Sequence, residues 1–130
     1  MAIKTIRVTV TGINPLLFNN PQTVDPSNEY AKVMKKITSK KVKTEDDLAK
    51  LHDLEIRAKI YWDGEQIVVP TTWMTSAIHA TSFKRAKISK ANSRSGIFAV
   101  NATVPLRFKG IGKVKTPEDV VKNHEFRHSM

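Results

Sequence analysis

The segment from residue 66 to residue 94 constrains the fold of this chain more than any other. A short, mainly apolar run over residues 66–69 stops at Pro70, and small or apolar residues then follow at helical spacing. We expect Thr71 or Thr72 to cap this helix, because a threonine hydroxyl can accept a hydrogen bond from the first unpaired N–H groups. The segment therefore predicts a strand that leads directly into a helix.

Positive charge is concentrated at the end of this segment. No acidic residue occurs between Glu65 and Glu118, whereas many basic residues do. They are Lys84, Arg85, Lys87, Lys90, Arg94, Arg107, Lys109, Lys113 and Lys115. Residues 88–95 show neither a strand nor a helix period, so we expect an exposed basic loop there. An acid-free interval of this length favours a polyanionic partner.

The composition points to one domain over residues 1–130. The chain carries a formal net charge of +10 and is 40% hydrophobic, which is enough apolar sequence for one core. It has no cysteine, which excludes disulfides and thiolate metal sites and is consistent with a cytoplasmic location. We find neither a signal peptide nor a membrane-spanning run, and therefore expect no membrane partner.

The first half of the chain predicts one strand, two helices and a hairpin. Residues 3–10 alternate like a half-buried strand, and Asp25 followed by Pro26 is expected to start a helix. Thr44 and Asp47 form a capping-box pattern for a second helix, and an Asp-Gly turn predicts a hairpin before residue 69. The lysines between the two helices are interpreted as a solvated helix end in preference to a second nucleic-acid contact.

The second half adds strands and a short helix after the basic segment. Residues 96–104 alternate as a strand would, residues 106–112 are expected to form a further strand, and Pro117 is expected in a short final helix. Together these patterns predict an α+β fold with an antiparallel sheet of about four strands and about three helices.

Two segments resemble a known family. Residues 69–79, Val-Pro-Thr-Thr-Trp-Met-Thr-Ser-Ala-Ile-His, resemble the strand-to-helix signature of the RAMP superfamily, the backbone subunits of CRISPR effector complexes. That signature reads apolar-Pro-Gly-Ser-Ser-Leu-Lys-Gly-Ala-Leu-Arg. Residues 8–17 look like the family's first strand and the loop behind it. Residues 8–17 also look like phage-encoded proteins of unassigned role that share both segments.

The resemblance implies a ferredoxin-like, RNA-recognition-type sheet with helices on one face, binding single-stranded RNA. This sequence departs from the signature at four positions. Thr71 and Ser76 replace the two glycines, Thr75 replaces the lysine, and His79 replaces the arginine. Lys84 and Arg85 follow and are expected to replace that charge. Family members are usually longer, so we expect a fragment or a reduced relative.

One catalytic motif stands near the end of the sequence. His124, Glu125 and His128 match H-E-x-x-H, in which two histidines on one helix face bind zinc and the glutamate activates water. A zinc metallopeptidase needs a third ligand downstream, and only Ser129 and Met130 follow. We therefore keep this as a remote alternative and expect no metal, no other cofactor and no enzymatic activity.

The leading hypothesis is a non-catalytic protein that binds single-stranded RNA or DNA. Unpaired N–H groups at a helix start can hold a phosphate, basic side chains can follow the backbone, and Trp73 or Phe98 can stack a base, although each ring is more typical of a core. The expected contacts are Thr71, Thr72, Trp73, Lys84, Arg85, Lys87, Lys90, Arg94, Arg107 and Lys109.

The alternative from another class is a phage protein that binds a CRISPR effector, or assembles with itself, by imitating a subunit. Such an anti-CRISPR-like protein would have CRISPR effector subunits or further copies of this chain as partners, and it would bind naked oligonucleotides weakly.

Overall fold

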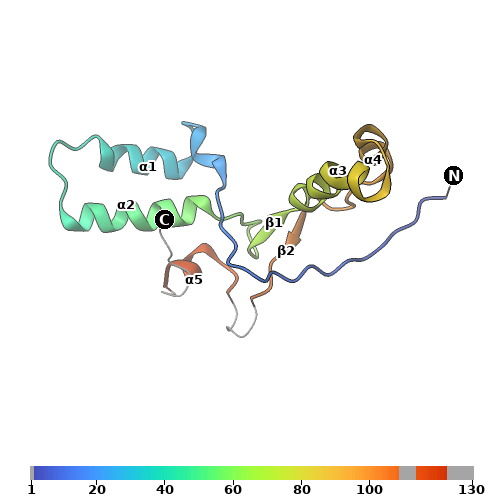
Figure 1. The fold of residues 1–130 in the computed structure, drawn as a ribbon. Coiled ribbons are helices and arrows are strands. Elements are labelled where there is room, and N and C mark those ends of the chain that lie inside the picture. The colour runs from blue at the N-terminus through green and yellow to red at the C-terminus, as the bar shows by residue number, and fades with distance from the viewer. Residues whose placement is uncertain (1, 109–113, 123–130) are drawn as a thin grey trace.

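The structure, a computed structural model, describes residues 2–108 and 114–122 and is α-rich (Figure 1). In these ranges the elements in chain order are the 3-10 helix η1 (Pro21–Val24), α1 (Glu29–Thr38), α2 (Glu45–Lys59), β1 (Val68–Pro70), α3 (Thr72–Ala86), α4 (Lys90–Gly96), β2 (Thr103–Pro105) and α5 (Pro117–Lys122). The two strands pair antiparallel, with Val69 opposite Val104. A helical hairpin of α1 and α2 lies at one end, and α3 with α4 lies at the other.

The predicted ferredoxin-like sheet of about four strands is wrong. Residues 3–10 are extended but pair with no strand among the described residues, and of residues 96–104 only the last two belong to β2. Alternation indicates which side chains share a face, but it does not supply a neighbouring strand. The predicted hairpin is reduced to a bridge between Trp62 and Ile67. The strand predicted over residues 106–112 has no strand geometry at residues 106–108, and residues 109–113 lie outside the described ranges.

Local capping signals set the starts of the helices. Asn28 caps α1 through its side chain, which accepts the amide of Tyr30 at 3.0 Å, so the predicted start at Asp25 was three residues early. Asp25 instead accepts hydrogen bonds from the amide and hydroxyl of Ser27. The predicted α2, α3 and α5 are confirmed close to their expected positions.

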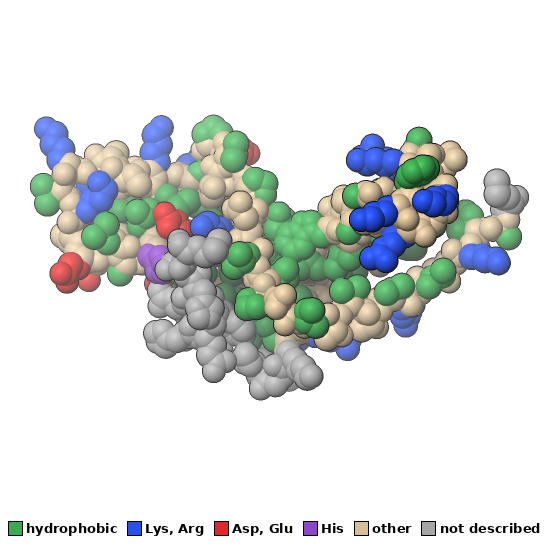
Figure 2. All heavy atoms as spheres, in the orientation of Figure 1, with side chains coloured by type: hydrophobic (Ala, Val, Ile, Leu, Met, Phe, Trp, Pro, Cys, Tyr) green, Lys and Arg blue, Asp and Glu red, His purple; other side chains and the backbone are tan. Residues whose placement is uncertain are grey.

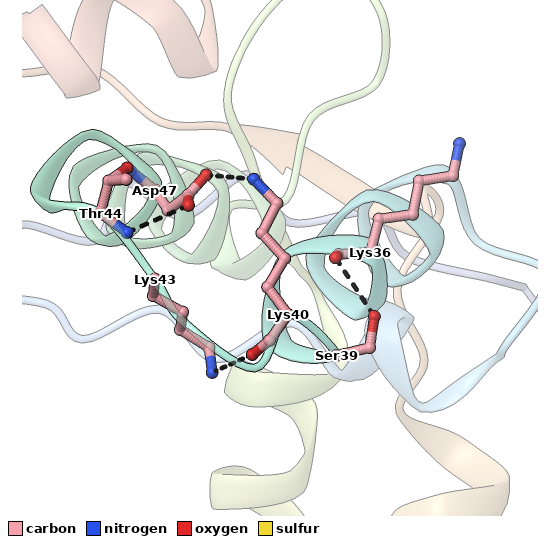
Figure 3. Close-up of polar contacts among 6 residues, drawn as sticks. All are labelled: Lys36, Ser39, Lys40, Lys43, Thr44 and Asp47. Atoms are coloured by element: carbon pink, nitrogen blue, oxygen red, sulfur yellow. Dashed lines mark hydrogen bonds and ion pairs between the residues drawn. The ribbon is translucent and has the colours of Figure 1, made fainter.

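The capping box of α2 also organises the turn between α1 and α2 (Figure 3). The Asp47 amide donates to Thr44 Oγ1, and an Asp47 carboxylate oxygen accepts the Thr44 amide, each at 3.1 Å. Lys40 Nζ lies 2.6 Å from the same carboxylate, and Lys43 Nζ donates to the Lys40 carbonyl. These two lysines are therefore engaged within the chain.

The buried core is small and lies between the helical hairpin and the sheet. Ile60, Ile67 and Val120 are its centre. The partly buried residues packed against it are Phe18, Ile56, Leu106, Phe108 and Val114. The chain exposes 10,785 Å² in total, whereas a compact monomer of 14.6 kDa exposes roughly 6,900 Å². Much apolar surface therefore remains in contact with solvent.

A cluster of three aromatic rings connects the two halves of the molecule. Tyr61 and Trp73 meet edge to face with their centroids 5.6 Å apart, and Phe18 lies 6.3 Å and 6.2 Å from the two rings. These residues come from the N-terminal segment, the end of the helical hairpin and the first turn of α3. The cluster therefore fixes the position of α3 relative to α2.

The carboxylates of Asp47 and Asp119 should make the stability of this fold depend on pH. The hydrogen bond from Lys40 lowers the pKa of Asp47, and the hydrogen bond from the Lys115 amide lowers the pKa of Asp119. Each group therefore stabilises the folded chain above its unfolded pKa, and that contribution is lost as the pH falls through the folded pKa. Because an unperturbed Asp has a pKa of about 3.9, the free energy of unfolding in urea should fall progressively as the pH is lowered from about 5 to about 2.

The double variant Asp47→Asn, Asp119→Asn should show a shallower decline over the same pH range. An equally steep decline in both proteins would contradict the assignment to these two carboxylates.

Candidate nucleic-acid interface

Residues 88–95, predicted as an exposed loop, mostly belong to the helix α4. The last residue before the connection, Lys87, takes a left-handed conformation with φ of 59°, which ends α3. Ser89 then caps α4 by accepting the Asn92 amide at 3.2 Å. The prediction failed because Ser93 is the buried residue of α4, so the helix shows no apolar stripe in the sequence. Its other residues are exposed, as expected.

A polar contact holds α4 against α3. His79 Nδ1 lies 2.7 Å from Ser93 Oγ, and Ser93 is only 1% exposed. His79 and Ser93 lie fourteen residues apart and belong to no common motif, so their contact has no signal in the sequence. Because Ser93 is shielded from solvent, we interpret this contact as a tie between helices and not as a nucleophile with its base.

A hollow of about 510 Å³ lies where α3, α4 and the segment before β2 meet. It is lined by Thr71, Thr72, Thr75, His79, Arg94, Ile97, Phe98, Ala99, Asn101 and Ala102. Three of the predicted contact residues, Thr71, Thr72 and Arg94, therefore come together around one depression. Arg94 supplies its positive charge, and the threonines, His79 and Asn101 supply hydrogen-bonding groups.

Thr71 shapes this hollow in a way that differs from the prediction. It is the N-cap residue of α3, but its side chain makes no capping hydrogen bond. The hydroxyl instead contacts the carbonyl oxygens of Asn101 and Ala102 at 2.8 Å and 2.9 Å, and the Thr71 amide donates to Ala102 as well. Thr71 therefore fastens the wall of the hollow to the start of α3.

The basic side chains of α3, α4 and their connection are exposed, and within the described ranges none of them pairs with an acidic residue. Figure 2 shows Lys and Arg side chains gathered over the end of the molecule formed by α3 and α4. The exposed basic residues of these two helices and their connection are Lys84, Arg85, Lys87, Lys90 and Arg94. Ion pairs within the described ranges are Lys40 with Asp47 and Arg57 with Glu118, so none involves this group. Lys87 Nζ lies over the Phe83 ring at 5.6 Å.

The remaining predicted contact residues differ in their burial and in their position relative to the hollow. Trp73 is half-buried in the aromatic cluster, a position that favours packing over base stacking. Phe98 is 64% exposed and lines the hollow, which leaves its ring accessible for stacking. Arg107 is exposed beyond β2 but does not line the hollow, and Lys109 lies outside the described residues.

The described part of the chain contains no group of three or more His, Cys, Asp or Glu side chains that could hold a metal ion. The H-E-x-x-H motif lies outside these residues, so the zinc hypothesis stays untested. Within the same ranges, no helix has the length and apolar character required to cross a membrane.

Comparison of the chain with known proteins gave no match to a protein-family model, to a curated protein or to a solved structure. The relation to the RAMP superfamily therefore stays a prediction from two segments of sequence.

Substitution of the two candidate stacking rings should separate packing from binding. Trp73→Ala should lower the free energy of unfolding by about 2 kcal/mol or more, because the half-buried ring loses its contacts with Phe18 and Tyr61. Phe98→Ala should change it by less than about 0.5 kcal/mol, because this ring is mostly exposed. Urea denaturation followed by circular dichroism measures both values, and equal losses would contradict the assignment.

Proposed function

We propose that this chain is a non-catalytic protein that binds single-stranded nucleic acid through the surface formed by α3 and α4. One observation carries the proposal: α3, α4 and their connection carry five exposed basic residues without acidic partners in the described ranges, and one of them, Arg94, lines a hollow that presents an exposed aromatic ring. Basic side chains attract a phosphate backbone, and a flat ring accepts any unpaired base. A single strand supplies phosphates and free bases together, whereas a duplex keeps its bases stacked.

The proposed site differs from the lysine-rich turn between α1 and α2. In that turn Lys40 pairs with Asp47, and Lys43 bonds to a backbone carbonyl (Figure 3). Acidic residues also start α2. The basic residues of α3 and α4 have no such partners in the described ranges, so a phosphate can reach them without displacing a carboxylate.

The resemblance of residues 69–79 to the RAMP signature supports RNA as the strand that is bound. This segment leads into α3 and lines one side of the hollow. The support is limited to this segment and to residues 8–17, because the sheet that the family implies is replaced here by two short strands.

Neutralising the basic surface should abolish this binding without unfolding the protein. We expect the variant with Lys84, Arg85, Lys87, Lys90 and Arg94 changed to Gln to bind a labelled single-stranded RNA roughly 100-fold more weakly in fluorescence anisotropy. Loss of five phosphate contacts should also remove roughly 3.5 from the slope of log affinity against log salt. The melting temperature should stay nearly unchanged, because these side chains are exposed.

A matched control changes five exposed lysines elsewhere, namely Lys32, Lys35, Lys36, Lys41 and Lys50, to Gln. Both variants remove five positive charges from a net charge of +10, so both keep a net charge of +5. The control should retain most of the affinity. Equal losses in the two variants would mean that only net charge matters, and would contradict a defined site. Absence of wild-type binding at physiological salt would refute the function and favour a protein partner.

A further inference from the structure

The N-terminal segment carries the strongest unassigned feature of the molecule. Residues 2–17, here called the N-terminal arm, are exposed throughout and mostly extended. Ile6, Val8 and Val10 alternate with polar residues and are 81%, 73% and 63% exposed. Between described residues, no backbone hydrogen bond joins the arm to another segment. The arm therefore has the pattern of a strand that lies on a core, without the core or the neighbouring strand.

The same chain offers an open sheet edge. The backbone N–H and C=O groups of residues 102, 104 and 106 point toward β1 and its flanking residues. The Leu106 amide donates to the Ile67 carbonyl, and the Thr71 amide donates to the Ala102 carbonyl. The backbone amide and carbonyl of Thr103 therefore point to the outer edge of β2. Val100, just before β2, is 78% exposed and does not line the hollow. Pro105 lacks an N–H group, so added pairing has to use residues 99–104.

We propose that the N-terminal arm of one copy of this chain pairs with residues 99–104 of a second copy, and that the arm of the second copy pairs with residues 99–104 of the first. Each copy then donates one strand and accepts one, as a two-fold dimer requires. The apolar residues of the arm cover Val100 and its surroundings. Arg7 lies on the opposite, polar face of the arm, whereas Lys4 shares the face of Ile6, Val8 and Val10. Residues 99–104 carry no charge, so Lys4 meets no positive charge on the accepting segment.

Reach and direction favour a second copy over the arm's own sheet. The arm is anchored at its end by the next residue, Phe18, which the aromatic cluster fixes, and the sixteen residues of the arm can span about 50 Å when extended. Figure 1 shows it running past the sheet and away from it, to an end beyond α3 and α4. A segment that projects this far from its own sheet is placed to reach a neighbouring molecule.

The area involved reaches the lower part of the range of stable dimers. Burying an aliphatic side chain removes roughly 60–120 Å² from water, so the three aliphatic residues on one face of each arm supply roughly 180–360 Å². The accepting surface loses a similar area, and two reciprocal contacts then bury roughly 700–1,400 Å². Stable protein interfaces begin at roughly 1,200 Å². The solvent-accessible surface of the chain is 10,785 Å², well above the roughly 6,900 Å² of a compact monomer, so surface is available for such an interface.

Cysteine pairs test the proposal directly, because the natural chain contains no cysteine. The variants Ile6→Cys, Val8→Cys and Val10→Cys are each mixed with Val100→Cys, free of nucleic acid, and oxidised mildly. We expect at least one mixture to give a disulfide-linked heterodimer on a non-reducing gel. Val42→Cys, in the turn between α1 and α2 and 83% exposed, replaces Val100→Cys as the control and should give none.

Light scattering of the wild-type chain should give about twice 14.6 kDa without nucleic acid. Val8→Glu combined with Val10→Glu should raise the dimer dissociation constant roughly 100-fold, because two buried apolar contacts are lost and charges take their place. Thr9→Glu, on the polar face of the arm, should leave the dimer intact. A monomeric wild type, or a dimer that forms only with RNA, would overturn the proposal. A further variant carries an arm cysteine and Val100→Cys in the same chain. A disulfide that forms within this chain, but not between chains, would also overturn the proposal.

Discussion

The contact among Phe18, Tyr61 and Trp73 is the interaction on which the rest of this structure depends. The buried core is small, and it lies between the helical hairpin and the sheet. Without the aromatic cluster, α3 would be connected to that core mainly through the three residues of β1. The cluster joins the base of the N-terminal arm, the end of α2 and the first turn of α3. It therefore sets where the basic surface and the arm stand relative to the core.

The basic surface follows from how α3 and α4 are held. The left-handed Lys87 ends one helix, Ser89 starts the next, and the contact between His79 and Ser93 packs them together. Lys90 and Arg94 consequently stand on a capped helix and not on a free loop. Binding a strand at this surface costs less conformational entropy than ordering a loop would. The threonine hydroxyl that ties the start of α3 to residues 101 and 102 fixes the hollow in the same way.

Local signals in the sequence predicted local structure, and pairing between distant segments was not predictable from them. The capping box at Thr44, the break at Pro70 and the proline at residue 117 each act within a few residues, and α2, α3 and α5 start close to where these signals indicated. The sheet depends on contacts between segments more than thirty residues apart, which alternation alone does not specify.

The candidate site was predictable in its charge but not in its shape. The acid-free interval showed where positive charge would gather, whereas the contact between His79 and Ser93 had no signal in the sequence. Ser89 followed three residues later by Asn92 was a weak cap signal that a loop assignment ignored. Trp73 was weighed as a base platform, and its neighbours Phe18 and Tyr61 became evident only in the fold.

The central claim is that α3, α4 and the adjoining hollow form the contact surface for a single strand. Photocrosslinking of the wild-type protein to a 4-thiouridine RNA, followed by chymotryptic digestion and mass spectrometry, tests it most directly. Cleavage after Phe83 and Phe98 releases residues 84–98 as one peptide, which holds the five basic residues and the exposed ring. We predict that this peptide carries the main crosslink. Crosslinks confined to the lysine-rich turn between α1 and α2, or to the N-terminal arm, would contradict the account.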